Sequence, residues 1–128
     1  METNGVVLVA VASDVAQGLD VVVVRERGSV LVRPEGDLDA ATSPSLALVL
    51  ATLLGDGCTA VVLDLVELMS LDVAGAWLIG EASSLFRDRA GEIVVRSPRG
   101  PVRRALDSAG LAWLIETPRQ ARIAPVPG

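Results

Sequence analysis

The stretch Ser70-Leu71-Asp72-Val73-Ala74-Gly75-Ala76-Trp77 joins two different patterns in the middle of the chain. Residues 60–65 before it form a short, apolar, β-branched run, which predicts a buried strand. After it, apolar residues recur with helical spacing over residues 78–86. Asp72 stands where a helix takes its N-cap, because its carboxylate can accept N–H bonds from the first turn. A strand that leads into a helix N-terminus, with free amides and a positive dipole end, is a favoured place for a functional site, and we predict the site here.

The length and composition are those of one globular domain. A chain of 128 residues, 51% of them hydrophobic, is large enough to bury roughly two-thirds of its unfolded surface. We expect residues 1–128 to form a single domain, with an N-terminal extension over 1–18 that contains a strand, a core over 19–124 and a tail over 125–128. The net charge of −5 argues against nucleic acid as a direct partner, because neutralising phosphates needs a clustered cationic surface.

Cysteine usage and the N-terminus predict a cytoplasmic protein. Cys58 is the chain's one cysteine, so no internal disulfide can form, which fits a reducing compartment. We expect it to be a small buried or half-buried residue, and the alternative is a redox-sensing or dimer-linking thiol. Residues 1–4 lack the basic start of a signal peptide. The apolar run over 6–12 is too short to span a bilayer, so we expect no membrane insertion.

The first third of the chain predicts strands. Residues 6–12 and 19–25 are apolar and β-branched, and residues 29–33 return after a turn at Gly28 as the second arm of a hairpin. Pro34 has no N–H for a ladder and therefore marks an edge, a bulge or the end of the strand.

One helix is predicted on each side of the central strand. Thr42 or Ser43 is a suitable N-cap with Pro44 at the first helical position, and the apolar stripe that follows ends at Gly55. The second helix ends at Gly91.

The C-terminal part continues the alternation of strand and helix. Residues 92–96 predict a strand, and residues 98–108 have helical spacing closed by Gly110. Residues 111–115 predict a short edge strand, and residues 120–123 a helical turn. Strands that alternate with helices after an initial hairpin imply an α/β fold, with a mixed sheet and helices packed against it.

Basic residues are unevenly spread along the chain. The C-terminal part carries a run of arginines, while the first half is richer in acids. We interpret the arginines as solvated helix and loop faces, and the alternative is a patch that meets an acidic surface of a partner. The run comprises Arg87, Arg89, Arg96, Arg99, Arg103 and Arg104.

Four motifs follow one another in a specific order. They are Gly36-Asp37-Leu38-Asp39, Val61-Val62-Leu63-Asp64-Leu65, Leu71-Asp72-x-x-Gly75, and Ser97-Pro98 followed by Val102-Arg103-Arg104-Ala105-Leu106 and Gly110-Leu111. In this order they resemble the STAS-domain proteins, most of all the bacterial anti-sigma-factor antagonists, over residues 20–124. The resemblance implies a STAS-like α/β domain, with a mixed central sheet of about four to six strands and helices mainly on one side.

The resemblance also implies a function. Anti-sigma-factor antagonists bind an anti-sigma factor, an ATP-using protein kinase of the histidine-kinase-like ATPase fold, and so free the sigma factor. The kinase then phosphorylates a serine directly after the aspartate at the start of the second helix, and the complex falls apart.

This chain departs from that pattern at the phosphorylated position. The family's usual run is Asp-Ser-Ser-Gly, whereas this chain has Asp72-Val73-Ala74-Gly75, so the acceptor position is Val73 and neither following residue carries a hydroxyl. A phosphoserine adds about −1.5 to −2 units of charge, which would repel a closely fitted partner. We therefore predict partner binding that phosphorylation at this position does not turn off.

The resemblance places the partner-binding surface on the loop before the first helix and on the start and outer face of the second. Asp37 is a partner contact or a turn residue, and for Asp39 we favour turn and cap chemistry. We expect Ser70 to make a loop hydrogen bond. We expect Trp77 in the core, with an exposed contact anchor as the alternative. The candidate set is Asp37, Asp39, Ser70, Asp72, Val73, Ala74, Gly75 and Trp77.

The sequence argues against an enzyme. It contains no histidine, so it has no Ser-His-Asp or Cys-His arrangement and no Cys/His cluster for zinc. It also has no G-x-x-x-x-G-K-[ST] loop for nucleotide phosphates. We expect no catalytic residue, no metal and no cofactor. The alternatives are a STAS-like accessory subunit of a membrane transporter and a nucleotide-sensing STAS module whose amides at 73–75 hold a phosphate; a homodimer through the N-terminal strand stays open.

Overall fold

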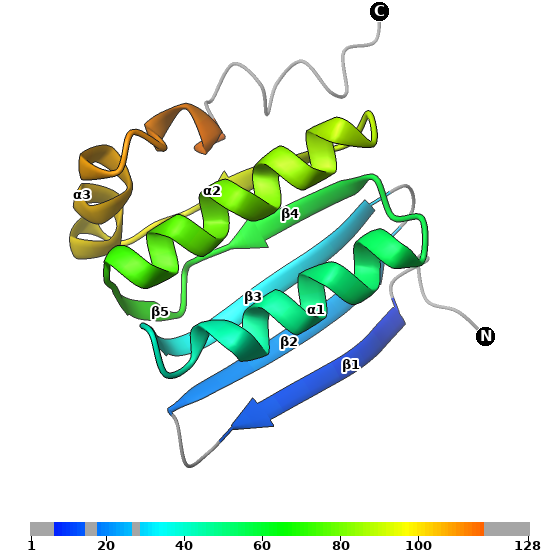
Figure 1. The fold of residues 1–128 in the computed structure, drawn as a ribbon. Helices are drawn as coiled ribbons and strands as arrows, with labels where there is room; N and C mark the ends of the chain where they lie inside the picture. Colours follow the sequence, from blue (N-terminus) through cyan, green and yellow to red (C-terminus); the bar gives the residue numbers. More distant parts are fainter. Residues whose placement is uncertain (1–6, 15–17, 27–28, 117–128) are drawn as a thin grey trace, which may run out of the picture.

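A mixed sheet with helices on one face makes up the part of the chain that the computed structural model describes, residues 7–14, 18–26 and 29–116 (Figure 1). The elements are β1 (Val7–Asp14), β2 (Leu19–Glu26), β3 (Ser29–Leu38), α1 (Ser43–Gly55), β4 (Ala60–Asp64), β5 (Leu68–Leu71), α2 (Val73–Asp88), β6 (Glu92–Arg96), α3 (Gly100–Ser108) and a short 3-10 helix, η1 (Ala112–Leu114).

Within the described residues the sheet has six strands, which confirms the predicted α/β fold. Its main path is β1-β2-β3-β4-β6, in which β1, β2 and β3 are antiparallel neighbours and β3, β4 and β6 are parallel. The strand β5 lies off this path and pairs in parallel with the end of β3, where Leu38 is opposite Leu71. One edge of β3 is therefore shared by β4 and, further along, by β5.

The core lies between the sheet and the helices α1 and α2, which cross the same face (Figure 1). Alternate residues of β2, β3, β4 and β6 point into it, as expected for a sheet covered on one face. The largest fully buried side chains include Leu19, Leu38, Leu46, Leu63, Leu65, Leu68, Ile79, Phe86 and Leu106.

Pro34 does not end its strand, contrary to one of the sequence-based alternatives. β3 runs through it to Leu38, with Pro34 opposite Val21 of β2. Two residues later the N–H of Gly36 donates to the Glu67 carbonyl, so the nitrogen of Pro34 points to the same edge. That position falls between the last β4 pair and the first β5 pair, where the ladder requires no donor.

The C-terminal segment differs from the prediction. Residues 111–115 are not an edge strand: residues 112–114 form η1, and Ile115 makes a single parallel bridge to Val95. Gly110, with φ of 77°, ends α3, and the next N–H, of Leu111, turns back to the Leu106 carbonyl at 2.9 Å. This reversal leaves too little extended chain for a strand. The helical turn expected over 120–123 lies outside the described residues.

Ser83 is a polar residue in the buried face of α2. Its Oγ is buried and has no hydrogen-bond partner among the described residues. Because a buried unpaired hydroxyl costs about 1–3 kcal/mol, we expect Ser83→Ala to raise the free energy of unfolding by about 1 kcal/mol in urea denaturation. The control Ser84→Ala changes an exposed neighbour and should shift stability by less than about 0.5 kcal/mol. Destabilisation by Ser83→Ala would contradict the prediction.

Candidate partner-binding surface

The site forms where β3 and β5 end side by side. Asp37 pairs with Ser70 in the parallel ladder, and the Ser70 hydroxyl donates to Asp37 Oδ1 at 2.7 Å. The N–H of Asp72 donates to the Leu38 carbonyl at 3.1 Å, which attaches the start of α2 to the end of β3. The hydrogen bond expected for Ser70 is thus present, although Ser70 lies in β5 and not in a loop, and its acceptor is another candidate residue.

Asp72 caps α2, as the sequence predicts. It has extended backbone angles, and its Oδ1 accepts a hydrogen bond from the Gly75 N–H at 3.0 Å. Asp72 as a residue is exposed, so its carboxylate satisfies one amide of the first turn at the protein surface.

We expect Asp72→Ala to lower the free energy of unfolding by about 1 kcal/mol, because the first turn loses its side-chain acceptor. Asp72→Asn keeps an N-cap of similar quality and should retain most of the stability. Chemical denaturation of the two variants and the parent measures the difference. An equal loss for both would assign the effect to the negative charge at the helix dipole instead of the cap.

Gly75 allows α2 to begin close to the sheet. It is buried, and a Cβ built on it would lie 2.8 Å from the Leu38 carbonyl oxygen and 2.7 Å from Leu71 Cδ1. Both distances are shorter than side chains tolerate. The first turn of α2 therefore packs closely against β3 and β5 through Gly75. Val73, on the opposite side of this turn, faces solvent.

Asp39 has the structural role that the sequence favoured. Its Oδ1 accepts hydrogen bonds from the N–H groups of Ala41 and Thr42, each at 3.0 Å, and its own N–H donates to Thr42 Oγ1. The Thr42 hydroxyl in turn donates to the Asp37 carbonyl at 2.8 Å. Thr42 is thus the N-cap residue of α1 without a side-chain cap bond, because its hydroxyl is used to hold the loop.

Val73 and Trp77 form an exposed apolar ridge along α2. Their exposed fractions are 86% and 67%, and they lie one helical turn apart. The expectation that Trp77 is in the core is wrong. The buried face of α2 is already filled, and this orientation turns position 77 outward; the buried residues are Gly75, Ala76, Ile79, Ala82, Ser83 and Phe86.

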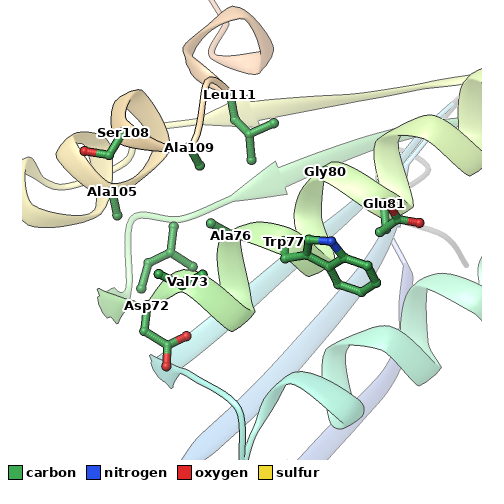
Figure 2. Close-up of a pocket in the computed structure, with 11 residues that line it drawn as sticks. Asp72, Val73, Ala76, Trp77, Gly80, Glu81, Ala105, Ser108, Ala109 and Leu111 are labelled. Carbon is green, nitrogen blue, oxygen red and sulfur yellow. The ribbon is translucent and has the colours of Figure 1, made fainter.

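Two apolar grooves flank the ridge. The α2–α3 groove, with a volume of about 530 Å³, is drawn in Figure 2 and is lined by Leu71, Asp72, Val73, Ala76, Trp77, Gly80, Glu81, Ala105, Ser108, Ala109 and Leu111. The α1–α2 groove, of about 650 Å³, is lined by Ala40, Ser43, Pro44, Ala47, Val73, Ala74, Trp77 and Leu78. Val73 and Trp77 border both, so the ridge stands between two hollows.

Cys58 lies apart from this surface. It precedes β4, whereas the ridge lies beyond the other end of that strand. The thiol is half-buried, with Sγ 3.6 Å from the Ala60 carbonyl oxygen. The redox role of Cys58 stays a prediction.

Within the part of the chain that the structure describes, three of the six clustered arginines make a side-chain ion pair, hydrogen bond or ring contact. Arg96 pairs with Glu116 at 3.3 Å, Arg99 Nε donates to the Val66 carbonyl at 2.8 Å, and Arg87 stacks 4.7 Å from the Trp113 ring centre. These contacts fit the interpretation as helix and loop faces.

The described residues contain no group of three or more His, Cys, Asp or Glu side chains that could hold a metal ion. Within the same residues no helix is both long and apolar enough to cross a membrane. The arrangement offers an apolar contact surface beside several carboxylates.

Sequence reasoning missed β5 and the two grooves. β5 has only four residues, and two of them are exposed, so it has no strong period. The two leucines of this segment, Leu68 and Leu71, were the only local sign that it packs against the core. The pairing of β5 with β3 depends on residues more than thirty positions away, which no local pattern indicates.

A model of the STAS domain matches residues 20–123, and the chain belongs to the STAS domain family. An anti-sigma factor antagonist from Mycobacterium paratuberculosis is 21% identical with a TM-score of 0.72, over 88% of this chain and 97% of that one. The anti-sigma factor antagonist SpoIIAA in its unphosphorylated form is 20% identical with a TM-score of 0.66, over 78% of this chain and 91% of that one.

SpoIIAA in its phosphorylated form, described as a Bacillus cell fate determinant, is 22% identical with a TM-score of 0.57, over 77% of this chain and 91% of that one. At these identities the likeness shows a shared fold. Sequence comparison with curated proteins gives no significant match.

Proposed function

We propose that this STAS domain is an anti-sigma-factor antagonist: it binds an anti-sigma factor of the histidine-kinase-like ATPase fold and thereby releases a sigma factor. The observation that carries the proposal is the exposed ridge of Val73 and Trp77 at the capped start of α2. Tryptophan is enriched among the anchors of protein interfaces. The antagonists named above share the fold, which supports the same class of partner.

The contact surface in this proposal comprises the ridge and the corner around it. Asp37, Ser70 and Asp72 supply exposed polar groups, and Ala74 and Gly75 set the path of the first turn. Asp39 contributes indirectly, because its hydrogen bonds fix the loop that follows β3 and Asp37.

The amides of the α2 start do not favour the nucleotide-sensing alternative. The Gly75 N–H already donates to Asp72 Oδ1, so the chain's own carboxylate uses this amide and places a negative charge where a phosphate would approach. No observation favours an accessory subunit of a transporter over a sigma-factor regulator.

A release assay tests the proposal. ATPase-fold anti-sigma factors from the same genome are purified, each bound to its sigma factor, and this chain is added at increasing concentration. We expect one complex to lose its sigma factor and gain this chain in size-exclusion chromatography with mass determination. If every complex keeps its sigma factor at saturating concentrations of a folded chain, the proposal is wrong.

Phosphorylation should not act at the start of α2. Val73 and Ala74 have no hydroxyl, and Ser70 precedes the capping residue and donates to Asp37. With the cognate kinase and ATP, intact-mass analysis followed by peptide mapping should find no phosphate on residues 70–75, whereas Val73→Ser should gain one. Stoichiometric modification of Ser70 in the parent chain would contradict the prediction.

A further inference from the structure

The far face of the sheet, the one turned away from α1 and α2, carries a continuous apolar row (Figure 1). Val24 of β2 pairs with Leu31 of β3, and Leu31 pairs with Val62 of β4. Val62 in turn pairs with Val94 of β6. These four residues alternate with buried core residues along their strands, yet they are half-buried themselves and belong neither to the core nor to the residues packed against it. The far face therefore presents apolar surface that the described residues leave uncovered.

Two carboxylates on the far face have no ion pair. Asp64 and Glu92 alternate with core residues of β4 and β6, so they point to the same side as the apolar row. The two arginines on this side, Arg33 and Arg96, already pair with glutamates. Among the described residues Asp64 and Glu92 make no ion pair, which leaves negative charge around the apolar row. Such a face attracts a basic, apolar segment.

The last described residues bring the chain to the border of the far face. Ile115 bridges to Val95 and packs against the core. The N–H of Glu116 donates to the Val95 carbonyl at 2.7 Å, and its carboxylate pairs with Arg96 at 3.3 Å. Because Arg96 follows the buried Val95 in β6, its side chain lies on the side of the apolar row, and Glu116 reaches that side with it.

The segment that follows has the length and the composition that the far face requires. Residues 117–128, fully extended, reach about 40 Å, and the path from β6 to β2 over three strand spacings is about 15 Å. They contain Arg119 and Arg122 and no acidic residue, so their charge is opposite to that of the face. Ile123 and Val126 are their large apolar side chains.

We propose that residues 117–128 cross the far face of the sheet and cover its apolar row. Ile123 and Val126 pack on the row, and the two arginines of the segment pair with the two free carboxylates. A second copy of the chain fits this face less well, because two such faces would bring their unpaired carboxylates together. The inference is independent of the proposed function, since the far face lies across the sheet from α2.

A spin label in this segment tests the proposal on the full chain. Ala124→Cys in a Cys58→Ser background gives a single site for a nitroxide, which broadens the NMR signals of nearby methyl groups. We expect the methyl signals of the apolar row to lose most of their intensity. The methyl signals of Leu48 and Val73, exposed on the helices, should keep theirs. Weak, uniform broadening, or broadening that is strongest on the helices, would overturn the proposal.

A mixed sample distinguishes the chain's own segment from a second copy. Spin-labelled chain without isotopes is mixed with isotope-labelled chain that carries no spin label. We expect the apolar-row signals of the isotope-labelled chain to stay sharp. If they broaden, the occupant of the far face comes from another molecule and the proposal is wrong.

Charge reversal tests the pairing that assigns residues 117–128 to this face. Arg119→Glu with Arg122→Glu should restore most of the apolar-row intensity, and raised salt should do so in part for the parent. Arg103→Glu with Arg104→Glu, the same change of net charge at exposed positions of α3, should leave the broadening unchanged. Unchanged methyl signals of the helices report an intact fold in each variant.

A compensating change completes the test. Adding Glu92→Lys to the reversed segment should bring back part of the broadening, because opposite charges then face each other again. If the reversed segment keeps the parent's broadening, or if the α3 variant loses it equally, the charge match is refuted and the proposal with it.

Discussion

Replacing Gly75 with alanine is expected to lower the free energy of unfolding by about 2–3 kcal/mol, the usual cost of overpacking a filled site. The new methyl group would lie 2.8 Å from the Leu38 carbonyl oxygen and within 3 Å of the Leu38 and Leu71 side chains. The carbonyl cannot move freely, because it accepts the hydrogen bond from the Asp72 N–H. Alanine's better helix propensity, worth about 1 kcal/mol, is too small to offset this clash.

Gly80 is the matched control in the same helix. A Cβ there would meet Leu111 Cδ2 at 3.5 Å, which is ordinary contact. Gly80→Ala should therefore raise stability by about 0.5–1 kcal/mol, the propensity gain alone. Urea denaturation of both variants measures the contrast. If Gly75→Ala matched Gly80→Ala, the close approach of α2 to β3 and β5 would be refuted.

The sequence predicted the features of this corner that depend on neighbouring residues. A carboxylate three residues before Gly75 is a local N-cap signal, and the structure places the Asp72 hydrogen bond there. Asp39 is a similar case, since its acceptors and donors lie within a few residues along the chain. The alternation of strands and helices was local as well, and it was enough to predict the α/β fold.

Features that depend on long-range packing were not predictable. The close packing of Gly75 against Leu38 and Leu71 decides which side of α2 faces the sheet. The same packing turns Trp77 to solvent. Helical spacing alone allowed either face, because Trp77 and Leu78 are adjacent apolar residues on different sides of the helix. The bond from Ser70 to Asp37 joins residues 33 positions apart, so no local pattern could indicate it.

A charge on the ridge should abolish partner binding without harming the fold. We expect Val73→Glu to weaken the affinity for the anti-sigma factor found in the release assay by at least roughly a hundredfold, because an unpaired charge buried in an interface costs several kcal/mol. Val73 is 86% exposed in the free chain, and an acidic residue in the first turn interacts favourably with the helix dipole. Stability should therefore stay within about 0.5 kcal/mol of the parent.

Leu48→Glu gives the control for this test. Leu48 is 69% exposed on α1, lines neither groove beside the ridge, and changes from aliphatic to acidic in the same way. Isothermal titration calorimetry should give the parent Kd for Leu48→Glu and a large increase for Val73→Glu. Equal affinities of the two variants would place the interface away from α2, since a closely packed contact at position 73 cannot accept a carboxylate that has no partner.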